Sequence, residues 1–320
     1  MDNKFNPPFY LRGTQAQTIL ASSKLRKIGK NRMVECGGDM IIDAGDGVRL
    51  LGYFSPQKND SARGLVIMLN GWEGSHESAY MVSTGRYLYE KGYSLFRLNF
   101  KDHGDSYHLN EGLFYATLID EVYNAICAAA ELSRNKPVFL VGFSMGGNFA
   151  LRVAMRHSAK KIGNLKGVYC ISPLMDPEKS TDLLDNSFMM RKYFLKKWRR
   201  SLVKKQELYP HLYNFDDVIN LETCRIITDR LIPRYSEYGS STEYFKEYTI
   251  KPASLSKIDV PMHIVTSEDD PIIPVEDFYN LKSSTAVTLI IHKYGGHNGF
   301  IENIKLDAWY EREMISFFEQ

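Results

Sequence analysis

Short, mostly apolar runs of strand length alternate with longer segments of helical periodicity along the chain. Six runs of this kind occupy residues 64–69, 94–100, 137–143, 167–172, 260–267 and 286–292. Most are followed by segments with the apolar spacing of an amphipathic helix, at 78–92, 115–132, 148–156, 275–283 and 308–320. This alternation predicts a largely parallel sheet with helices on both faces.

The segment 34–54 departs from this alternation. It follows a polar lead-in and holds two strand-like runs around "DAGDG" at 43–47. An Asp-Gly pair between two such runs favours a tight hairpin turn. We therefore expect two short hairpin strands before the parallel part of the sheet.

The interval after the run 167–172 is too long for an ordinary strand-to-strand crossover. We interpret residues 173–252 as a helical cap inserted into an α/β core formed by residues 1–172 and 253–320.

Within this insertion, the stretch "RKYFLKKWRRSLVKK" at 191–205 holds eight basic residues and no acid. Leu195, Trp198 and Leu202 share one helical face, so the stretch is first of all a solvated helix with a packed apolar side. The alternative is a basic amphipathic helix that makes peripheral contact with an anionic membrane surface.

Composition and charge narrow the function classes. The chain has 320 residues, 44% of them hydrophobic, and a formal net charge of +2, which gives no electrostatic reason to expect a nucleic-acid partner. The four cysteines form no C-x-x-C pair, and we expect Cys127 and Cys170 to be small buried side chains in a reducing compartment. With no apolar leader visible at the start, we expect a cytoplasmic protein.

The clearest chemical signal is "GFSMGG" at 142–147, directly after an apolar run and before a helical pattern. The pattern G-x-S-x-G at a strand-to-helix turn exposes a serine as a nucleophile. We therefore predict that Ser144 is the catalytic nucleophile. The structural alternative is a serine that only caps a helix.

A serine nucleophile needs a base, and the base needs an orienting acid, in the chain order Ser, Asp or Glu, His for this type of turn. His297 in "GGHNGF" follows the last strand run and is the predicted base. Asp270 in "SEDDPIIP" is the preferred acid, and Asp269 is the alternative.

Two backbone N–H groups are expected to stabilise the oxyanion. One is that of Met145, which follows the nucleophile at a helix N-terminus. The other is that of Trp72 in "NGWEGS", after the run 64–69. Gly71 in the same loop is predicted to border the substrate.

One loop holds four side chains of metal-ligating types, so a metal site is a candidate there. They are Asp102, His103, Asp105 and His108. No zinc-type spacing such as H-E-x-x-H is present. We therefore predict no metal, and we expect this loop to form turns beside the pocket, with His103 near the substrate. No phosphate-binding loop or dinucleotide motif occurs, so no cofactor is expected.

Taken together, these motifs resemble the YheT-like, embryogenesis-associated branch of the α/β-hydrolases. The similar segments are "FNPPFYLRGTQAQTI", "NGWEGSHESAY", "NF" followed by "HGDS", "GFSMGGN", "DDPIIP" and "GGHNGF". The resemblance implies an α/β-hydrolase fold, a triad of Ser144, Asp270 and His297, and activity on carboxylic esters, in some relatives medium-chain fatty esters or phospholipids. The chain departs from that branch at Trp72, where a leucine is usual, and in the loop 99–114.

The sequence thus predicts a serine hydrolase that cleaves small-molecule or lipid esters through an acyl-enzyme. Two alternatives stay open. An acyltransferase would use the same triad with an alcohol acceptor, and a non-catalytic binding protein would use the fold only as a scaffold.

Overall fold

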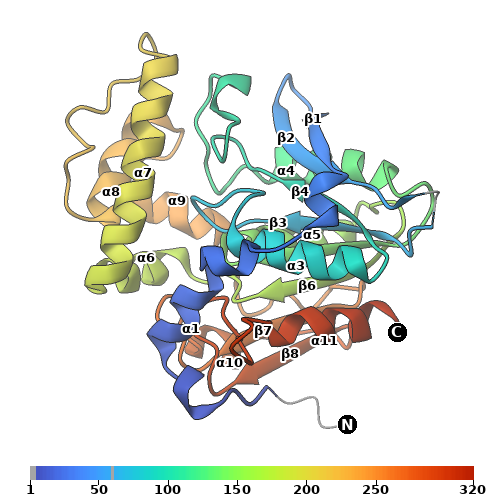
Figure 1. Cartoon of the computed structure of the whole chain (residues 1–320). Helices are drawn as coiled ribbons and strands as arrows, with labels where there is room; N and C mark the ends of the chain where they lie inside the picture. Colours follow the sequence, from blue (N-terminus) through green and yellow to red (C-terminus); the bar gives the residue numbers. More distant parts are fainter. Residues whose placement is uncertain (1–4, 59–60) are drawn as a thin grey trace.

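The computed structural model describes residues 5–58 and 61–320, and an eight-stranded sheet lies at its centre (Figure 1). The strands are β1 (Gly38–Asp43), β2 (Arg49–Ser55), β3 (Leu65–Leu69), β4 (Ser94–Leu98), β5 (Val138–Phe143), β6 (Leu165–Ile171), β7 (Met262–Ser267) and β8 (Val287–His292). Their order is β1-β2-β4-β3-β5-β6-β7-β8. β2 pairs antiparallel with β1 and β4, and the pairs from β4 to β8 are parallel, so the predicted hairpin and largely parallel sheet are confirmed.

The position of β3 between β4 and β5 determines where a site can form. The chain runs from β3 to β4 on one side and then crosses back to β5 on the other side. Such a switch point brings loops at the carboxyl ends of neighbouring strands together, with a crevice between them. Here these are the loops after β3 and β5.

Alternate residues of each strand point to opposite faces of the sheet, and helices bury both faces. On β3, Leu65, Ile67 and Leu69 join a core with α4 (Ile119–Glu131) and α5 (Met145–His157). Val66 and Met68 join a second core, which includes α3 (Ala79–Glu90) and α11 (Trp309–Phe318). These last two helices contact each other on the same side of the sheet (Figure 1).

The polar lead-in contains helices that the sequence analysis did not predict. They are the 3-10 helices η1 (Phe9–Leu11) and η2 (Lys24–Lys27) and the α-helices α1 (Thr14–Ala21) and α2 (Arg32–Glu35). Near the other end, α10 (Glu276–Tyr279) is one turn long, shorter than the predicted 275–283. A further 3-10 helix, η4 (Tyr107–Leu109), lies in the loop after β4.

Four helices occupy the predicted insertion between β6 and β7: α6 (Pro177–Asn186), α7 (Phe188–Leu208), α8 (Cys224–Tyr235) and α9 (Ser241–Tyr248). They gather at one side of the molecule in Figure 1, and α6 packs against the other three. α6 begins where the Asp176 carboxylate accepts hydrogen bonds from the Glu178 and Lys179 N–H groups, with Pro177 in the first turn. α7 contains the whole basic stretch.

All four cysteines are free thiols. Cys170 is buried as expected, whereas Cys127 is only half-buried, because α4 turns that position toward the edge of its packed face. Across residues 5–58 and 61–320, no helix combines the length and the apolar character needed to span a bilayer.

Candidate active site

Ser144 stands in a backbone conformation that ordinary residues avoid. Its φ is 53° and its ψ is −116°, at the junction of β5 and α5. The two flanking glycines are required by close approach. A Cβ on Gly142 would lie 2.3 Å from the Gly146 carbonyl oxygen, and a Cβ on Gly146 would lie 2.4 Å from that of Leu69. The glycine spacing therefore lets three backbone segments meet beneath Ser144, whose half-buried side chain lines the pocket.

The structure brings the predicted base and acid to this serine. His297 Nε2 is 2.9 Å from Ser144 Oγ, and His297 Nδ1 is 2.9 Å from Asp270 Oδ2. The other carboxylate oxygen of Asp270 accepts hydrogen bonds from the Ile272 and Ile273 N–H groups, both at 2.9 Å. The acid is thus fixed by the turn that follows β7, and it faces the imidazole.

Asp269 has different partners. Its Oδ1 accepts a hydrogen bond from the Gly296 N–H at 2.9 Å, and its Oδ2 accepts one from Thr14 Oγ1 at 3.1 Å. Asp269 therefore ties the loop of His297 to α1, while Asp270 contacts the ring itself.

The loop of His297 is held by α1, a role that the sequence analysis missed. The His297 N–H donates to Thr18 Oγ1 at 3.0 Å. The fully buried Gln17 side chain donates to the Leu11 and Ile301 carbonyls and accepts from the Ile301 N–H at 2.7 Å. The signal in the sequence that could have predicted this role is a set of polar side chains, Thr14, Gln17 and Thr18, which share one helical face at i, i+3 and i+4.

The two backbone N–H groups predicted as oxyanion donors have no acceptor among the described residues. Met145 is the first residue of α5, so its N–H has no acceptor within that helix. The Trp72 N–H has no acceptor among the described residues. Gly71 packs against the elbow, since a Cβ there would lie 3.3 Å from the Cβ of Ser144. The Gly71 N–H donates instead to the Tyr80 hydroxyl at 2.9 Å, where burial raises the pKa of Tyr80 to about 12.

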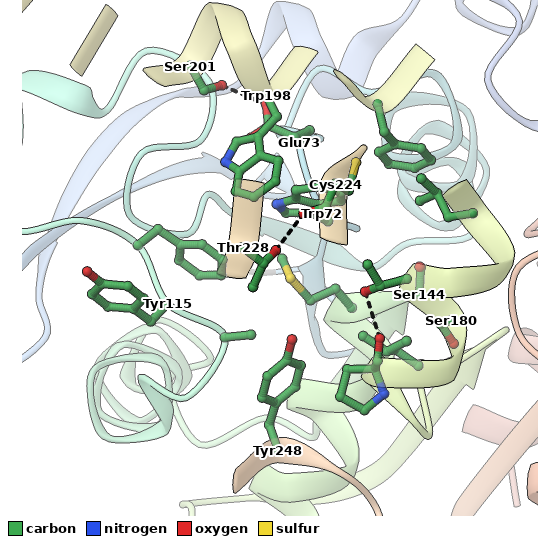
Figure 2. Close-up of a pocket in the computed structure, with 18 of the residues that line it drawn as sticks. Trp72, Glu73, Tyr115, Ser144, Ser180, Trp198, Ser201, Cys224, Thr228 and Tyr248 are labelled. Atoms are coloured by element: carbon green, nitrogen blue, oxygen red, sulfur yellow. Dashed lines mark hydrogen bonds between the residues drawn. The ribbon is translucent and has the colours of Figure 1, made fainter. Parts of the chain in front are cut away.

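A cavity of about 170 Å³ opens beside Ser144 and His297. Each of the four inserted helices contributes to its wall, which is mostly apolar. The apolar side chains from these helices include Leu184, Phe194, Trp198, Leu202, Leu231, Ile232 and Phe245. Figure 2 shows Ser144 and Ser180 on one side of the pocket and Tyr115 on the other.

The Trp72 ring joins the loop after β3 to α7. It stacks on Phe194 with ring centroids 5.3 Å apart and packs edge-to-face with Trp198 at 5.1 Å. The next residue, Glu73, reinforces this contact. Its carbonyl accepts from Lys197 Nζ at 2.9 Å, and its carboxylate accepts from Ser201 Oγ at 2.6 Å (Figure 2).

Burial raises the pKa of the Glu73 carboxyl to about 7, and only part of this shift is offset by the Ser201 hydrogen bond. A carboxyl that changes charge near neutral pH therefore lies in the pocket wall, one residue from the Trp72 N–H.

The loop of His103 makes hydrogen bonds within the protein. His103 Nδ1 donates to the Lys101 carbonyl at 2.8 Å and Nε2 accepts from the Glu73 N–H at 3.2 Å, while burial lowers the pKa of His103 to about 4. Both ring nitrogens of this neutral imidazole are occupied, so only its ring faces the pocket. Asp102 pairs with Lys205 at 2.8 Å. Among the described residues, no three His, Cys, Asp or Glu side chains gather as a metal site.

The strand order and the serine at the β5–α5 turn define an α/β-hydrolase. The chain belongs to the serine aminopeptidase S33 family, whose model matches residues 60–303.

Relatives cover most of the chain at low identity. The chain is 26% identical over 330 aligned positions to a Synechocystis protein named "Putative esterase slr0264", covering 94% of this chain and 88% of that one. It is 22% identical over 276 positions to human "Phospholipase ABHD3", covering 84% of this chain and 65% of the human one. Among solved structures, the Pyrococcus furiosus esterase PF2001 superposes with a TM-score of 0.55 at 18% identity, over 88% of this chain and 90% of that one. This likeness confirms the predicted α/β-hydrolase fold.

Proposed function

We propose that the protein is a serine hydrolase that cleaves carboxylic esters through an acyl-enzyme on Ser144. One observation carries the proposal: the series Ser144–His297–Asp270, joined by two contacts of 2.9 Å at the carboxyl ends of the strands. This is the arrangement in which a histidine can take the serine proton while an acid fixes its tautomer.

Each proton has a defined course in this proposal. His297 Nε2 accepts the Ser144 proton as Oγ attacks the ester carbonyl carbon. When the tetrahedral intermediate collapses, the C–O bond to the alcohol breaks, the alcohol takes that proton, and the acyl group stays on Ser144. Water then attacks the acyl carbon and gives a proton to His297, which returns it to Ser144 as the carboxylic acid leaves. Asp270 stabilises the imidazolium at both steps.

The proposed oxyanion donors are the N–H groups of Met145 and Trp72. Each donor of this kind is worth roughly 3 kcal/mol of barrier. The Trp72 donor depends on α7, because its ring packs on Phe194 and Trp198.

We assign the insertion, residues 173–252, as a cap that forms the acyl pocket and sets specificity. Its apolar contribution to the cavity suits a hydrocarbon acyl chain. The names of the relatives, an esterase and a phospholipase, point in the same direction. Within the superfamily we place the chain in the YheT-like branch, on the motifs given above.

The test is hydrolysis of a chromogenic ester series from acetyl to long acyl chains, by the wild type and by Ser144→Ala. We expect turnover that depends on Ser144 and peaks at an acyl length set by the cap. Because the family description names an aminopeptidase, an aminoacyl anilide is included, and turnover of the anilide alone would overturn the ester proposal.

Added alcohol distinguishes the acceptor. Free acid as the main product supports a hydrolase, whereas a transferred ester as the main product would make the protein an acyltransferase.

A further inference from the structure

The helix α7 has two differently built faces. Its inner face lines the cavity through Phe194, Trp198 and Leu202. Its outer face carries the side chains that the protein leaves exposed, among them Lys192, Lys196, Arg200, Phe188, Tyr193 and Val203.

Five of the eight basic residues of the stretch 191–205 are used to hold α7 in place. Their partners are carbonyl groups or carboxylates of the cap and the core, and the five are Arg191, Lys197, Arg199, Lys204 and Lys205. These charges are therefore accounted for by packing.

The other three are Lys192, Lys196 and Arg200, which follow one another at four-residue intervals and so form one exposed stripe. None of them makes an ion pair with another described residue, and the one acid on this side of the helix is Glu207 in the next turn. The stripe is a compact cationic surface whose charges the fold does not neutralise.

Exposed apolar side chains flank this stripe. Phe188 is 71% exposed, Tyr193 is 44% exposed and Val203 is 38% exposed. Lys192 Nζ lies 5.9 Å from the Phe188 ring centroid. Cations interleaved with aromatic and aliphatic side chains on one helix face are typical of helices that lie in the interface of an anionic bilayer.

We propose that the outer face of α7 docks on an anionic lipid surface. The helix then lies between that surface and the pocket that its inner face lines. The relevance to a lipid ester substrate rests on the function proposed above, but the binding itself does not. A purely polyanionic partner, such as nucleic acid, would use the three cations and leave Phe188 and Tyr193 without a role.

The test measures co-sedimentation of the full chain, as Ser144→Ala, with vesicles of phosphatidylcholine alone or in equal parts with phosphatidylglycerol. The inactive background makes the result independent of catalysis. We expect binding to the mixed vesicles only, weakened by salt. Each basic residue near an anionic membrane contributes roughly fivefold to binding, so Lys192→Gln/Lys196→Gln/Arg200→Gln should lower the partition coefficient on the order of 100-fold.

The matched control is Lys166→Gln/Lys257→Gln/Lys305→Gln, which removes three exposed core lysines and the same charge. It should retain binding. Phe188→Ser/Tyr193→Ser should weaken vesicle binding and leave any binding to a single-stranded DNA oligonucleotide unchanged. The proposal would be overturned if the protein did not bind the mixed vesicles or if the two triple variants bound them equally. It would also be overturned if Phe188→Ser/Tyr193→Ser lost binding to the oligonucleotide but kept its binding to the vesicles.

Discussion

Asp269 and Asp270 are neighbours in the chain with different tasks. Asp270 contacts the His297 ring at 2.9 Å, whereas Asp269 holds the backbone of Gly296 and the hydroxyl of Thr14. In the proposed mechanism only the Asp270 carboxylate stabilises the imidazolium.

Exchange of each aspartate for asparagine should separate the two tasks. Asp270→Asn should lower kcat on the order of 10³- to 10⁴-fold, because the amide favours the wrong histidine tautomer. Asp269→Asn should mainly lower the unfolding midpoint, since it weakens a link between the loop and α1. The measurement is the kcat of both variants from steady-state kinetics at equal concentrations of folded protein. A loss of turnover in Asp269→Asn with an active Asp270→Asn would refute the assignment.

Glu73 gives a prediction for pH. Its folded pKa of about 7 lies above the ordinary 4.5, so the folded state binds this proton more tightly than the unfolded state. The stability from this group is present below pH 4.5 and is lost as pH rises toward 7, by about 1.4 kcal/mol for each unit of pKa difference. The free energy of unfolding of the wild type should therefore fall relative to that of Glu73→Gln across this window. Urea denaturation of both proteins at several pH values is the measurement, and parallel pH curves would contradict it.

At the scale of elements, the site depends on the close approach of β3, β5 and α5. Gly146→Ala would place a Cβ against the Leu69 carbonyl oxygen, so we expect a loss of about 1–3 kcal/mol in the free energy of unfolding. Gly163→Ala is the control, because its Cβ would meet nothing within 4 Å. Denaturant titration of both variants tests this, and equal stabilities would show that the elbow tolerates a side chain.

The elements that the sequence predicted well are those with strong local signals. The parallel strands are continuous apolar runs because both of their faces are buried. By contrast, α1 was missed because it has only eight residues, six of them Thr, Gln or Ala, and so short a helix is marginal in isolation. Its stability comes from long-range contacts, such as those of Gln17 with Ile301, that no local pattern contains.

The same limit applied to the candidate site. The spacing of glycines around Ser144 was sufficient to predict a strand-to-helix turn. The position of Asp270 directly before "PIIP" favoured it over Asp269 but left Asp269 as an alternative, since both follow β7 and only the fold decides which carboxylate meets the ring. The contact of Trp72 with α7 joins residues far apart in the chain and was equally invisible.

At the scale of the whole molecule, the core holds the proposed reacting groups and the insertion forms much of the pocket wall. Ser144, Asp270 and His297 follow β5, β7 and β8, while α6, α7, α8 and α9 enclose the cavity beside them. In the proposed function, chemistry and specificity therefore belong to separate parts of one chain, which meet where Trp72 packs on α7.

The central claim is that this assembly activates Ser144 as a nucleophile. Its most direct test is the reaction of the folded protein with a fluorophosphonate, followed by intact mass and peptide mapping. The account predicts a single adduct on Ser144 in the wild type, none in Ser144→Ala, and much slower labelling in His297→Ala. A folded wild type whose Ser144 stays unlabelled would contradict the account and leave the fold as a binding scaffold.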